Sequence, residues 1–531
     1  MENSQFSTSK LKFQPAKWEL KIFETNKLLP AKWEFKFSRP IVCSQLGGNF
    51  KFLTPTNCHQ LALVNVFLCQ SHLFWLTNAT FYLTQPENVP TATLEECALL
   101  GLFLETGKLL FSWPGGMLLD KYGSKKVTLI IGFINSLSWM MLVFCNSLNW
   151  VYIVRMLSGS ALALNFCNYT SVIGELSSPE FRGIFSSIVL LVGRFAAVYQ
   201  GTISVIFDSY KSLAVSAAIL SLFFFPMTYF LIESPYFLMN EGKGERVRRS
   251  LEKLHPNAST SEIEEKLRQM KRLIESQKKA KIDASLWQIF TKKSYRKTVL
   301  RVCLINGFVQ LSGAQIFTYY VTILLPSNRF VSNVSYPLII SLTTISAQLF
   351  WTAKIENFPR RILFLITCPL SSLLWISMGT IYFYDLQEQE FWKVIVYVDA
   401  IVIMAIMGAL LLPLIDIISA ELFPFNIKGK ANACVFVSRS IFAIITLIMF
   451  DIMAQKFGNY ASFYFYALTL SVLAVIVYFV LPETRGRSLI DLHFDSECEN
   501  GRYLENTKLL DAEIYQNYDG TNSNGKLPTE K

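Results

Sequence analysis

The sequence predicts an all-α membrane protein in which twelve transmembrane helices form two parallel six-helix repeats. Composition is the first observation: of 531 residues, 52% are hydrophobic and only 17% are charged, whereas soluble proteins carry about 25% charged residues. The second is a series of long apolar segments, and the third is a set of charged motifs that recurs in both halves. Composition also excludes a disordered chain, a collagen-like repeat and a disulfide-rich secreted domain.

Twelve segments are long and apolar enough to cross a bilayer, whose hydrocarbon core of about 30 Å needs about 20 residues of helix. The first six are 59–83, 97–118, 127–145, 149–172, 184–207 and 212–232. The second six are 299–325, 336–355, 362–384, 391–419, 431–454 and 460–481. We expect helices because backbone groups in lipid must be hydrogen-bonded within their own segment.

Lys and Arg residues gather in alternate connecting segments, and segment 233–298 alone contains sixteen of them. This excess predicts the cytoplasmic side of the membrane. We therefore expect an integral protein of the plasma membrane with both termini inside the cell. Five regions follow: a cytoplasmic N-terminal segment 1–58, a six-helix bundle 59–232, cytoplasmic central helices 233–298, a second bundle 299–482 and a cytoplasmic tail 483–531.

Asn-x-Ser/Thr sequons lie near two predicted outer helix ends, at Asn78 and Asn333. Such sequons are acceptors of N-linked glycans, so we predict a glycoprotein modified at these two residues. Two further sequons, at Asn168 and Asn257, are discounted because one lies within a predicted span and the other lies on the predicted cytoplasmic side.

Acidic and basic residues recur at matching places in the two halves. Glu175 and Arg182 follow the fourth span, and Glu421 and Lys428 follow the tenth; both pairs are seven residues apart, and both end in a base followed by Gly. Because six is an even number, the two halves enter the membrane with the same orientation. Transporters built from parallel repeats bind substrate near the bilayer midplane and rock one repeat against the other.

We predict that these charges form a cytoplasmic gate whose ion pairs break when the inner side opens. An exposed pair contributes about 0–1 kcal/mol, so several pairs together would bias the equilibrium between two states. A simpler interpretation, in which the charges only anchor helix ends, explains the bases but not the recurring acids. The predicted gate residues are Asp120, Arg155, Glu175, Arg182, Glu233, Glu356, Arg360, Arg361, Glu421, Lys428 and Glu483.

Several segments resemble the signatures of the sugar porter family of the major facilitator superfamily. They are Gly116–Lys126, Val154–Gly183, Glu233–Pro235, Gln310–Gly313 and Pro482–Ser488. The resemblance covers residues 59–492 and implies the major facilitator fold, alternating access and a sugar site between the halves. Within the family the chain is most similar to insect facilitated trehalose or glucose transporters, with a diverged sugar site.

The departures from the family pattern fall where the sugar is expected. The resemblance implies amide side chains at the positions of Leu190 and Val309, which carry none. It also implies an aromatic residue at Asp416 and an amide at Arg439. Sugar hydroxyls need donors and acceptors when they leave water. We predict these substrate-binding residues: Gln310, Gln315, Asp416 and Arg439.

Charged residues within predicted spans are costly, at least about 2.5–3.5 kcal/mol each when unpaired at mid-bilayer. We expect Glu105 to pair with Lys108 on one helix face, and Asp416 to pair with Arg439 across the tenth and eleventh spans. The second pair would reshape the cavity, so the substrate need not be a plain hexose. A helix–helix pair remote from the substrate is the alternative.

The sequence therefore predicts a transporter of a hexose, trehalose or a related polyol. Facilitated diffusion is favoured over proton symport because the first span contains His72 but no Asp or Glu. The alternative is a transport-inactive relative that acts as a nutrient sensor. We expect no enzyme, cofactor, metal or nucleic-acid partner, since the chain carries no metal-ligand spacing, nucleophile elbow or phosphate loop. The expected partners are the small-molecule substrate and the lipid bilayer.

Overall fold

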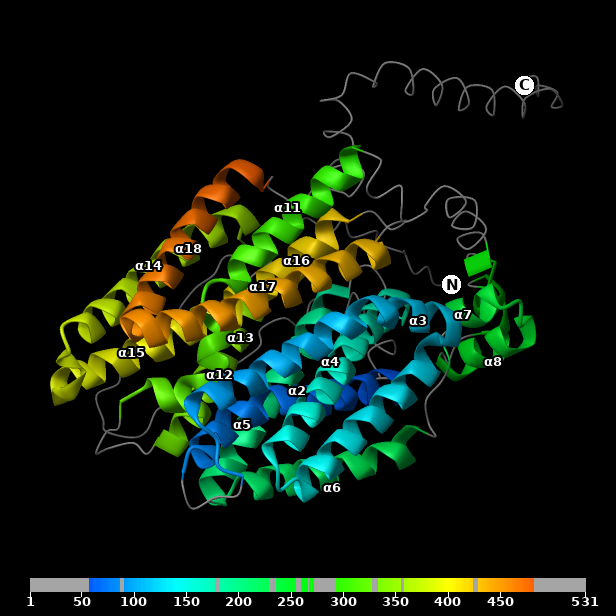
Figure 1. Cartoon of the computed structure of the whole chain (residues 1–531). Coiled ribbons are helices and arrows are strands. Elements are labelled where there is room, and N and C mark those ends of the chain that lie inside the picture. Colours follow the sequence, from blue (N-terminus) through cyan, green and yellow to red (C-terminus); the bar gives the residue numbers. More distant parts are fainter. Residues whose placement is uncertain are drawn as a thin grey trace, which may run out of the picture. The chain divides into compact units, whose positions relative to one another are not determined.

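The fold is built from helices throughout the part of the chain that the computed structural model describes (Figure 1). The described residues are 57–85, 90–176, 182–207, 209–228, 233, 235–254, 259–265, 267–268, 270–271, 293–326, 333–354, 358–423 and 428–481. Every regular element within these ranges is a helix. Nearly all of the predicted N-terminal segment 1–58 and the whole tail 483–531 lie outside them.

A first group of helices occupies the six spans predicted for the first half and is blue to teal in Figure 1. It comprises α2 (Asn57–Leu83), α3 (Leu94–Phe144), α4 (Leu148–Leu176), α5 (Arg182–Ile206) and α6 (Tyr210–Thr228). α3 covers both the second and the third span, and its backbone departs from helical geometry at Gly123, where φ is +79°. That left-handed conformation favours glycine.

A second group, green to orange in Figure 1, occupies the remaining six spans. The seventh span is divided into α11 (Lys293–Gln310) and α12 (Ala314–Leu324). The tenth is divided into α15 (Glu390–Ile406), a π-helical turn η5 (Met407–Leu411) and α16 (Leu412–Leu422). The unbroken helices are α13 (Tyr336–Lys354), α14 (Arg360–Phe383), α17 (Lys428–Phe457) and α18 (Asn459–Val480).

By length and composition, nine helical segments of the described residues are able to cross a membrane. The apolar stretch Tyr210–Phe224 of α6 is shorter. The remaining two predicted spans correspond to α2 and to the first part of α3, which is interrupted by Glu105 and Lys108. The observed helix bounds thus match the predicted spans to within a few residues. The reason is that the apolar length fixes each helix.

Two short helices follow the first group: α7 (Pro235–Asn240) and α8 (Gly244–Leu254). Leu238 of α7 and Val247 and Leu251 of α8 share a small core with Ile263 and Met270, which follow later in the chain. The opposite side of α8 is charged and exposed. Both helices lie within segment 233–298, and α8 is amphipathic.

Close backbone contact joins α3 and α4. An added Cβ at Gly107 would lie 2.1 Å from the carbonyl oxygen of Met156, and one at Gly159 would lie 2.1 Å from that of Leu104. Small residues allow helices in membranes to approach in this way. The two glycines therefore fix the distance between the second and fourth spans.

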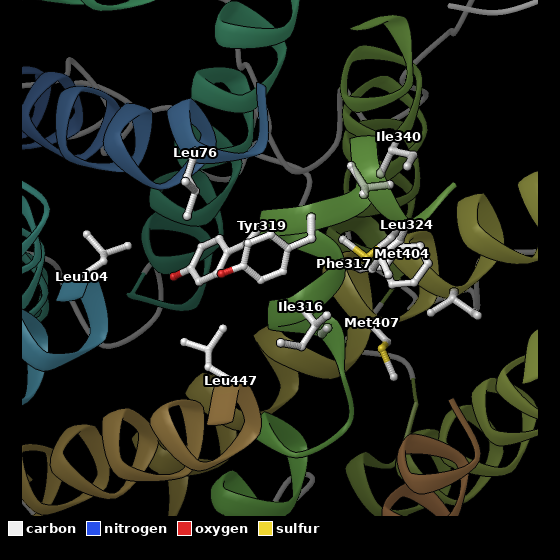
Figure 2. Close-up of a cluster of buried hydrophobic side chains, with 14 of the residues drawn as sticks. Leu76, Leu104, Ile316, Phe317, Tyr319, Leu324, Ile340, Met404, Met407 and Leu447 are labelled. Carbon is white, nitrogen blue, oxygen red and sulfur yellow. The ribbon is translucent and has the colours of Figure 1, made fainter. Parts of the chain in front are cut away.

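The main hydrophobic core contains residues of both helix groups. α12 contacts α2, α13 contacts α5, and α17 contacts α3. Figure 2 shows Tyr319 of α12 at the centre of this region, with Leu76 of α2, Leu104 of α3 and Leu447 of α17 around it. The divided seventh span therefore stands where the two groups meet.

Candidate functional site

The break in the seventh span occurs at Gly313, which has a φ of +83°. An added Cβ there would lie 2.4 Å from an aromatic ring of α18, so both conformation and space require glycine. Neighbouring helices satisfy the carbonyls released by the break: Thr446 donates to Gln310 O and Thr469 donates to Leu311 O, both at 3.1 Å. Irregular backbone at membrane depth is tolerated when it is satisfied in this way.

Two buried amides lie on the helix that precedes this break. Gln310 is 3% exposed, and its Nε2 has no hydrogen-bond partner among the described residues. Asn306, one turn earlier, has neither side-chain atom bonded within the same part of the chain. A buried polar atom without a partner costs about 1–3 kcal/mol. Both amides are therefore suited to contact a polar ligand. Sequence reasoning missed Asn306, although its four-residue spacing from Gln310 was a usable signal.

Gln315 lies apart from Gln310, in a hydrogen-bonded cluster with Glu105 of α3. Its Nε2 donates to the Glu105 carboxylate at 2.8 Å, and the hydroxyl of Tyr319 donates to the same oxygen at 2.7 Å. Lys108 donates to that oxygen at 2.6 Å, so the predicted pairing of Glu105 and Lys108 is present. The cluster joins the first helix group to the second. Tyr319, which sequence reasoning missed, follows Gln315 by one helical turn.

We call the membrane face at which α4 ends and α5 begins the predicted inner face, and the opposite face the predicted outer face. Near the outer face, hydrogen bonds connect α2 and α3 with α12. The hydroxyls of Thr80 and Thr322 are 3.0 Å apart, and the hydroxyl of Tyr320 donates to Cys97 O at 3.3 Å. We call the following set the outer seal: Thr77, Thr80, Cys97, Thr318, Tyr320 and Thr322.

Arg155 lies in the second turn of α4 and is fully buried. It donates to His72 O at 2.6 Å and to Leu100 O at 3.4 Å, and its guanidinium lies 5.7 Å from the ring of Trp75. Twenty residues separate it from Glu175 on one helix, a distance of about 30 Å. The structure therefore places Arg155 away from the inner face, contrary to the gate prediction. Its role is to join α2, α3 and α4.

Asp416 of α16 and Arg439 of α17 form the predicted pair, with 3.5 Å between carboxylate and guanidinium. Arg439 also lies over the ring of Phe166 of α4 at 5.6 Å. The pair thus stands where α16 and α17 meet the first helix group. About a quarter of each side chain is accessible, 27% for Asp416 and 24% for Arg439. Part of each charged side chain is therefore accessible at the surface of the described residues.

Arg194 occupies the middle of α5 and contacts the π-helical turn of the tenth span. Its Nη2 donates to the carbonyl of Gly408 at 2.8 Å. An added Cβ at Gly408 would lie 3.3 Å from this nitrogen and 2.9 Å from the methyl group of Thr344, so the glycine leaves room for the guanidinium. π-Helical turns occur frequently at functional sites. The sequence alone does not identify the partner of Arg194.

The other predicted gate residues divide into two sets. Seven lie outside the described residues or have side chains that do: Asp120, Glu175, Arg182, Glu356, Glu421, Lys428 and Glu483. The carboxylate of Glu233 accepts a hydrogen bond from the backbone of Lys125 at 3.1 Å. Arg361 donates to Tyr478 O and lies 4.9 Å from its ring, whereas Arg360 is buried and donates to Phe358 O at 3.2 Å. The gate stays a prediction.

The two predicted glycosylation residues lie in different surroundings. Asn78 is 2% exposed within α2, and its side-chain nitrogen donates to Phe74 O at 2.8 Å. A glycan cannot be attached to that nitrogen in the folded protein, so the structure contradicts this prediction. Asn333 begins the short 3₁₀ helix η2 (Asn333–Ser335) and is partly exposed. Its modification stays a prediction.

The arrangement of the helices is that of a major facilitator transporter, with twelve transmembrane helices in two parallel repeats. Similar solved structures include the partially occluded inward-open form of the xylose transporter XylE from E. coli, with a TM-score of 0.66 and 16% sequence identity. That comparison covers 82% of this chain and 99% of XylE. Residues 76–495 match the family model described as Sugar (and other) transporter, and the chain belongs to this family.

Individual relatives are distant in sequence but similar over most of their length. A facilitated trehalose transporter, Tret1 of Polypedilum vanderplanki, is 24% identical over 420 residues, which cover 75% of this chain and 79% of the relative. The sugar transporter ERD6-like 10 of Arabidopsis thaliana is 25% identical, with 75% and 86% covered. The glucose transporter GlcP of Staphylococcus epidermidis is 23% identical, with 75% and 88% covered.

Proposed function

We propose that this protein carries a sugar across the membrane by alternating access. The observation that carries the proposal is the break of the seventh span at Gly313, which follows the buried side chain of Gln310, whose Nε2 has no hydrogen-bond partner within the described part of the chain. Such an amide offers both a donor and an acceptor to a hydroxylated solute. The family match over residues 76–495 supports the same reaction. Relatives named as trehalose and glucose transporters make a disaccharide or a hexose the first candidates.

Transport by facilitated diffusion is the mode that we propose. A proton relay in the first repeat would need an accessible carboxylate. The described part of α2 carries His72 but no Asp or Glu. The ring of His72 is buried and stacks on Trp139 at a centroid distance of 3.7 Å. Glu105 is 2% exposed and already accepts hydrogen bonds from three donors in this state. Neither group is therefore placed to exchange protons with water.

Alternating access requires contacts that are made on one side and broken on the other. The outer seal and the Glu105 cluster supply such contacts between α3 and α12. At the predicted inner face we propose the ionic gate around Glu175 and Lys428. We also propose the five-region arrangement predicted above, with segments 1–58, 233–298 and 483–531 in the cytoplasm of a cell whose plasma membrane holds the two bundles.

The test is uptake of labelled glucose, trehalose, fructose and inositol into proteoliposomes that contain the full chain. We expect saturable uptake of at least one solute, with the same initial rate whether or not a proton gradient is imposed. Gln310→Ala should lower that rate about tenfold, because a lost partner of a buried polar group costs about 1–3 kcal/mol. Gln389→Ala, at an exposed position before α15, is the matched control and should have no effect.

The alternative of a transport-inactive nutrient sensor predicts a different result. A sensor would bind one of these sugars without moving it, so ligand-induced thermal stabilisation would occur in the absence of uptake. Uptake that requires a proton gradient would instead show that the mode of transport is symport. If neutral and acidic sugars alike are not taken up, the proposed function is contradicted.

A further inference from the structure

Among the residues whose side chains the structure describes, the charged groups where the two helix groups meet do not balance. Lys108 is paired with Glu105 at 2.6 Å, and Arg439 is paired with Asp416 at 3.5 Å. Arg194 has no carboxylate within ion-pair distance among the described residues, and its Nη2 donates to the backbone carbonyl of Gly408. An uncompensated charge at mid-membrane is costly, and such residues usually mark the path of a substrate or an ion. Arg194 is therefore a candidate to bind a negatively charged group that the described residues do not supply.

Arg194 lies at the middle of α5, and its side chain contacts the second helix group at Gly408. It lies twelve residues from each end of α5, about 18 Å from either membrane face along the helix. The hydrogen bond to Gly408 uses one nitrogen of the guanidinium. An Arg side chain carries five N–H bonds, so the guanidinium has further donors besides the one that bonds to Gly408. Arg194 is also partly exposed.

A second guanidinium lies in the same region. Arg194 contacts Gly408 and Arg439 contacts Asp416, two residues of the tenth span that are eight positions apart, about 12 Å along the helix. The like charges of Arg194 and Arg439 therefore repel each other beside this part of the tenth span. A single long contact joins Arg439 to Asp416. An anion placed between Arg194 and Arg439 would relieve their repulsion. It would also add hydrogen bonds to charged donors, which are about twice as strong as those between neutral groups.

The absence of amide side chains at two positions near this site also favours an anionic solute. Leu190, one turn before Arg194 on α5, and Val309, beside Gln310, offer no hydrogen bond to a sugar hydroxyl. Two fewer amides weaken the recognition of a neutral sugar, whose hydroxyls need both donors and acceptors. A carboxylate needs donors alone, and guanidinium groups supply them in a geometry that fits both of its oxygens.

We infer that Arg194 and Arg439 bind the carboxylate of an acidic sugar, so that the solute is a sugar acid such as a hexuronate. The inference rests on the proposed transport function and specifies the class of its substrate. The carboxylate lies between α5 and α17, and Gln310 contacts the hydroxyls of the sugar ring. Asp416 limits the excess of positive charge when the site is empty.

The test compares two solutes that differ at one carbon, D-glucuronate and D-glucose, in proteoliposomes of the full chain at pH 7. We expect glucuronate to be taken up at least about tenfold faster at low concentration, since hydrogen bonds to charged groups are worth more than those to neutral groups. Arg194→Gln keeps a donor for Gly408 but removes the charge. It should lower the glucuronate-to-glucose ratio about tenfold, whereas Arg194→Lys should retain most of it.

Arg249→Gln, on the exposed surface of α8, is the matched control and should leave the ratio unchanged. If Arg194 only holds the π-helical turn, Arg194→Gln will lower the melting temperature without changing the ratio, and the inference is overturned. Preference of the wild-type protein for glucose over glucuronate overturns it as well, and does so even if the variant does not fold. A preference for glucose would still be consistent with the proposed transport function.

A second measurement separates failure of the inference from failure of the proposed function. Glucuronate should raise the melting temperature of the purified protein more than glucose does at equal concentration. If it does so while neither solute is taken up, the acidic-sugar site stands and the proposed transport function is wrong. If glucose stabilises the protein and glucuronate does not, the site for an acidic sugar is refuted.

Discussion

Glu105 of α3 and Tyr319 of α12 are joined by a hydrogen bond of 2.7 Å that connects the first helix group to the second. Gln315 and Lys108 donate to the same carboxylate oxygen, so a single buried acid collects three donors. A carboxylate in this position attracts each donor strongly because little water competes. Tyr319 and Gln315 belong to α12, the same helix that contributes Thr318, Tyr320 and Thr322 to the outer seal. We therefore expect it to favour the state in which the predicted outer face is closed.

Removal of the Tyr319 hydroxyl should open that face more often. A hydrogen bond to a charged group contributes about 1.5–3 kcal/mol, so Tyr319→Phe should raise the population of the outward-open state about tenfold. The readout is maleimide modification of the buried thiol of Cys97, followed by peptide mass spectrometry. Tyr464→Phe, which removes a hydroxyl between α18 and α14, is the control and should leave Cys97 protected.

The pairing of Glu105 and Lys108 can be tested through stability. Glu105→Gln leaves the Lys108 ammonium without its carboxylate in the membrane and should destabilise the protein by up to about 3 kcal/mol, since an unpaired buried charge is costly. The double change with Lys108→Met removes both charges and should recover part of that loss. Thermal unfolding in detergent measures the three proteins. Equal losses from the single and the double change would show that the two charges do not interact.

Two glycines of α3 should respond differently to the same substitution. Gly107→Ala places a methyl group against the backbone of α4, where an added Cβ would lie 2.1 Å from Met156 O. We expect a loss of at least about 2 kcal/mol, because the helices must separate. Gly116→Ala meets no atom within 4 Å and should be neutral or stabilising by about 0.5–1 kcal/mol. Thermal unfolding of both variants gives the comparison, and similar losses would contradict the packing of α3 on α4.

The predicted inner gate can be tested by charge reversal. Lys428→Glu should create repulsion with Glu175 and change the initial uptake rate up to about fivefold, the effect of an exposed ion pair worth about 1 kcal/mol. The reciprocal change Glu175→Lys in the same chain should restore the rate. Lys243→Glu, beside an exposed pair with Glu241, is the control and should have no effect. A double variant as impaired as the single variant would refute the pairing of these residues.

The sequence predicts the helices well because apolar length alone decides them: the fourth span, expected at 149–172, is observed as α4 (Leu148–Leu176). The Asp416–Arg439 and Glu105–Lys108 pairs are predictable for a related reason, since charges in a membrane need partners. The spacing of Asn306 from Gln310 predicts that the two amides share a helix face. The role of Tyr319 depends instead on which helices face each other, and neither composition nor spacing gives that information.

Two errors of the sequence interpretation have simple physical causes. Arg155 belongs to the same signature as Glu175, but a helix rises about 1.5 Å per residue and therefore carries the two to different ends. Asn78 satisfies a three-residue pattern that contains no information on burial. The structure places it inside α2, where its amide is bonded to the preceding turn. Local patterns thus identify residues, whereas their surroundings come from the packing of distant segments.

The pair formed by Asp416 and Arg439 offers the sharpest test of the central site. Asp416→Ala leaves the Arg439 guanidinium without its counter-ion, and Arg439→Ala leaves the Asp416 carboxylate without its counter-ion. Each change should therefore lower the initial uptake rate at least about tenfold. Residues in contact show coupling energies of about 0.5–3 kcal/mol, so the double change should be less harmful than the sum of the two. Arg248→Ala and Glu252→Ala, an exposed pair on α8 at 3.1 Å, form the control cycle and should not affect uptake. Strictly additive losses at Asp416 and Arg439 would show that the observed contact has no part in transport.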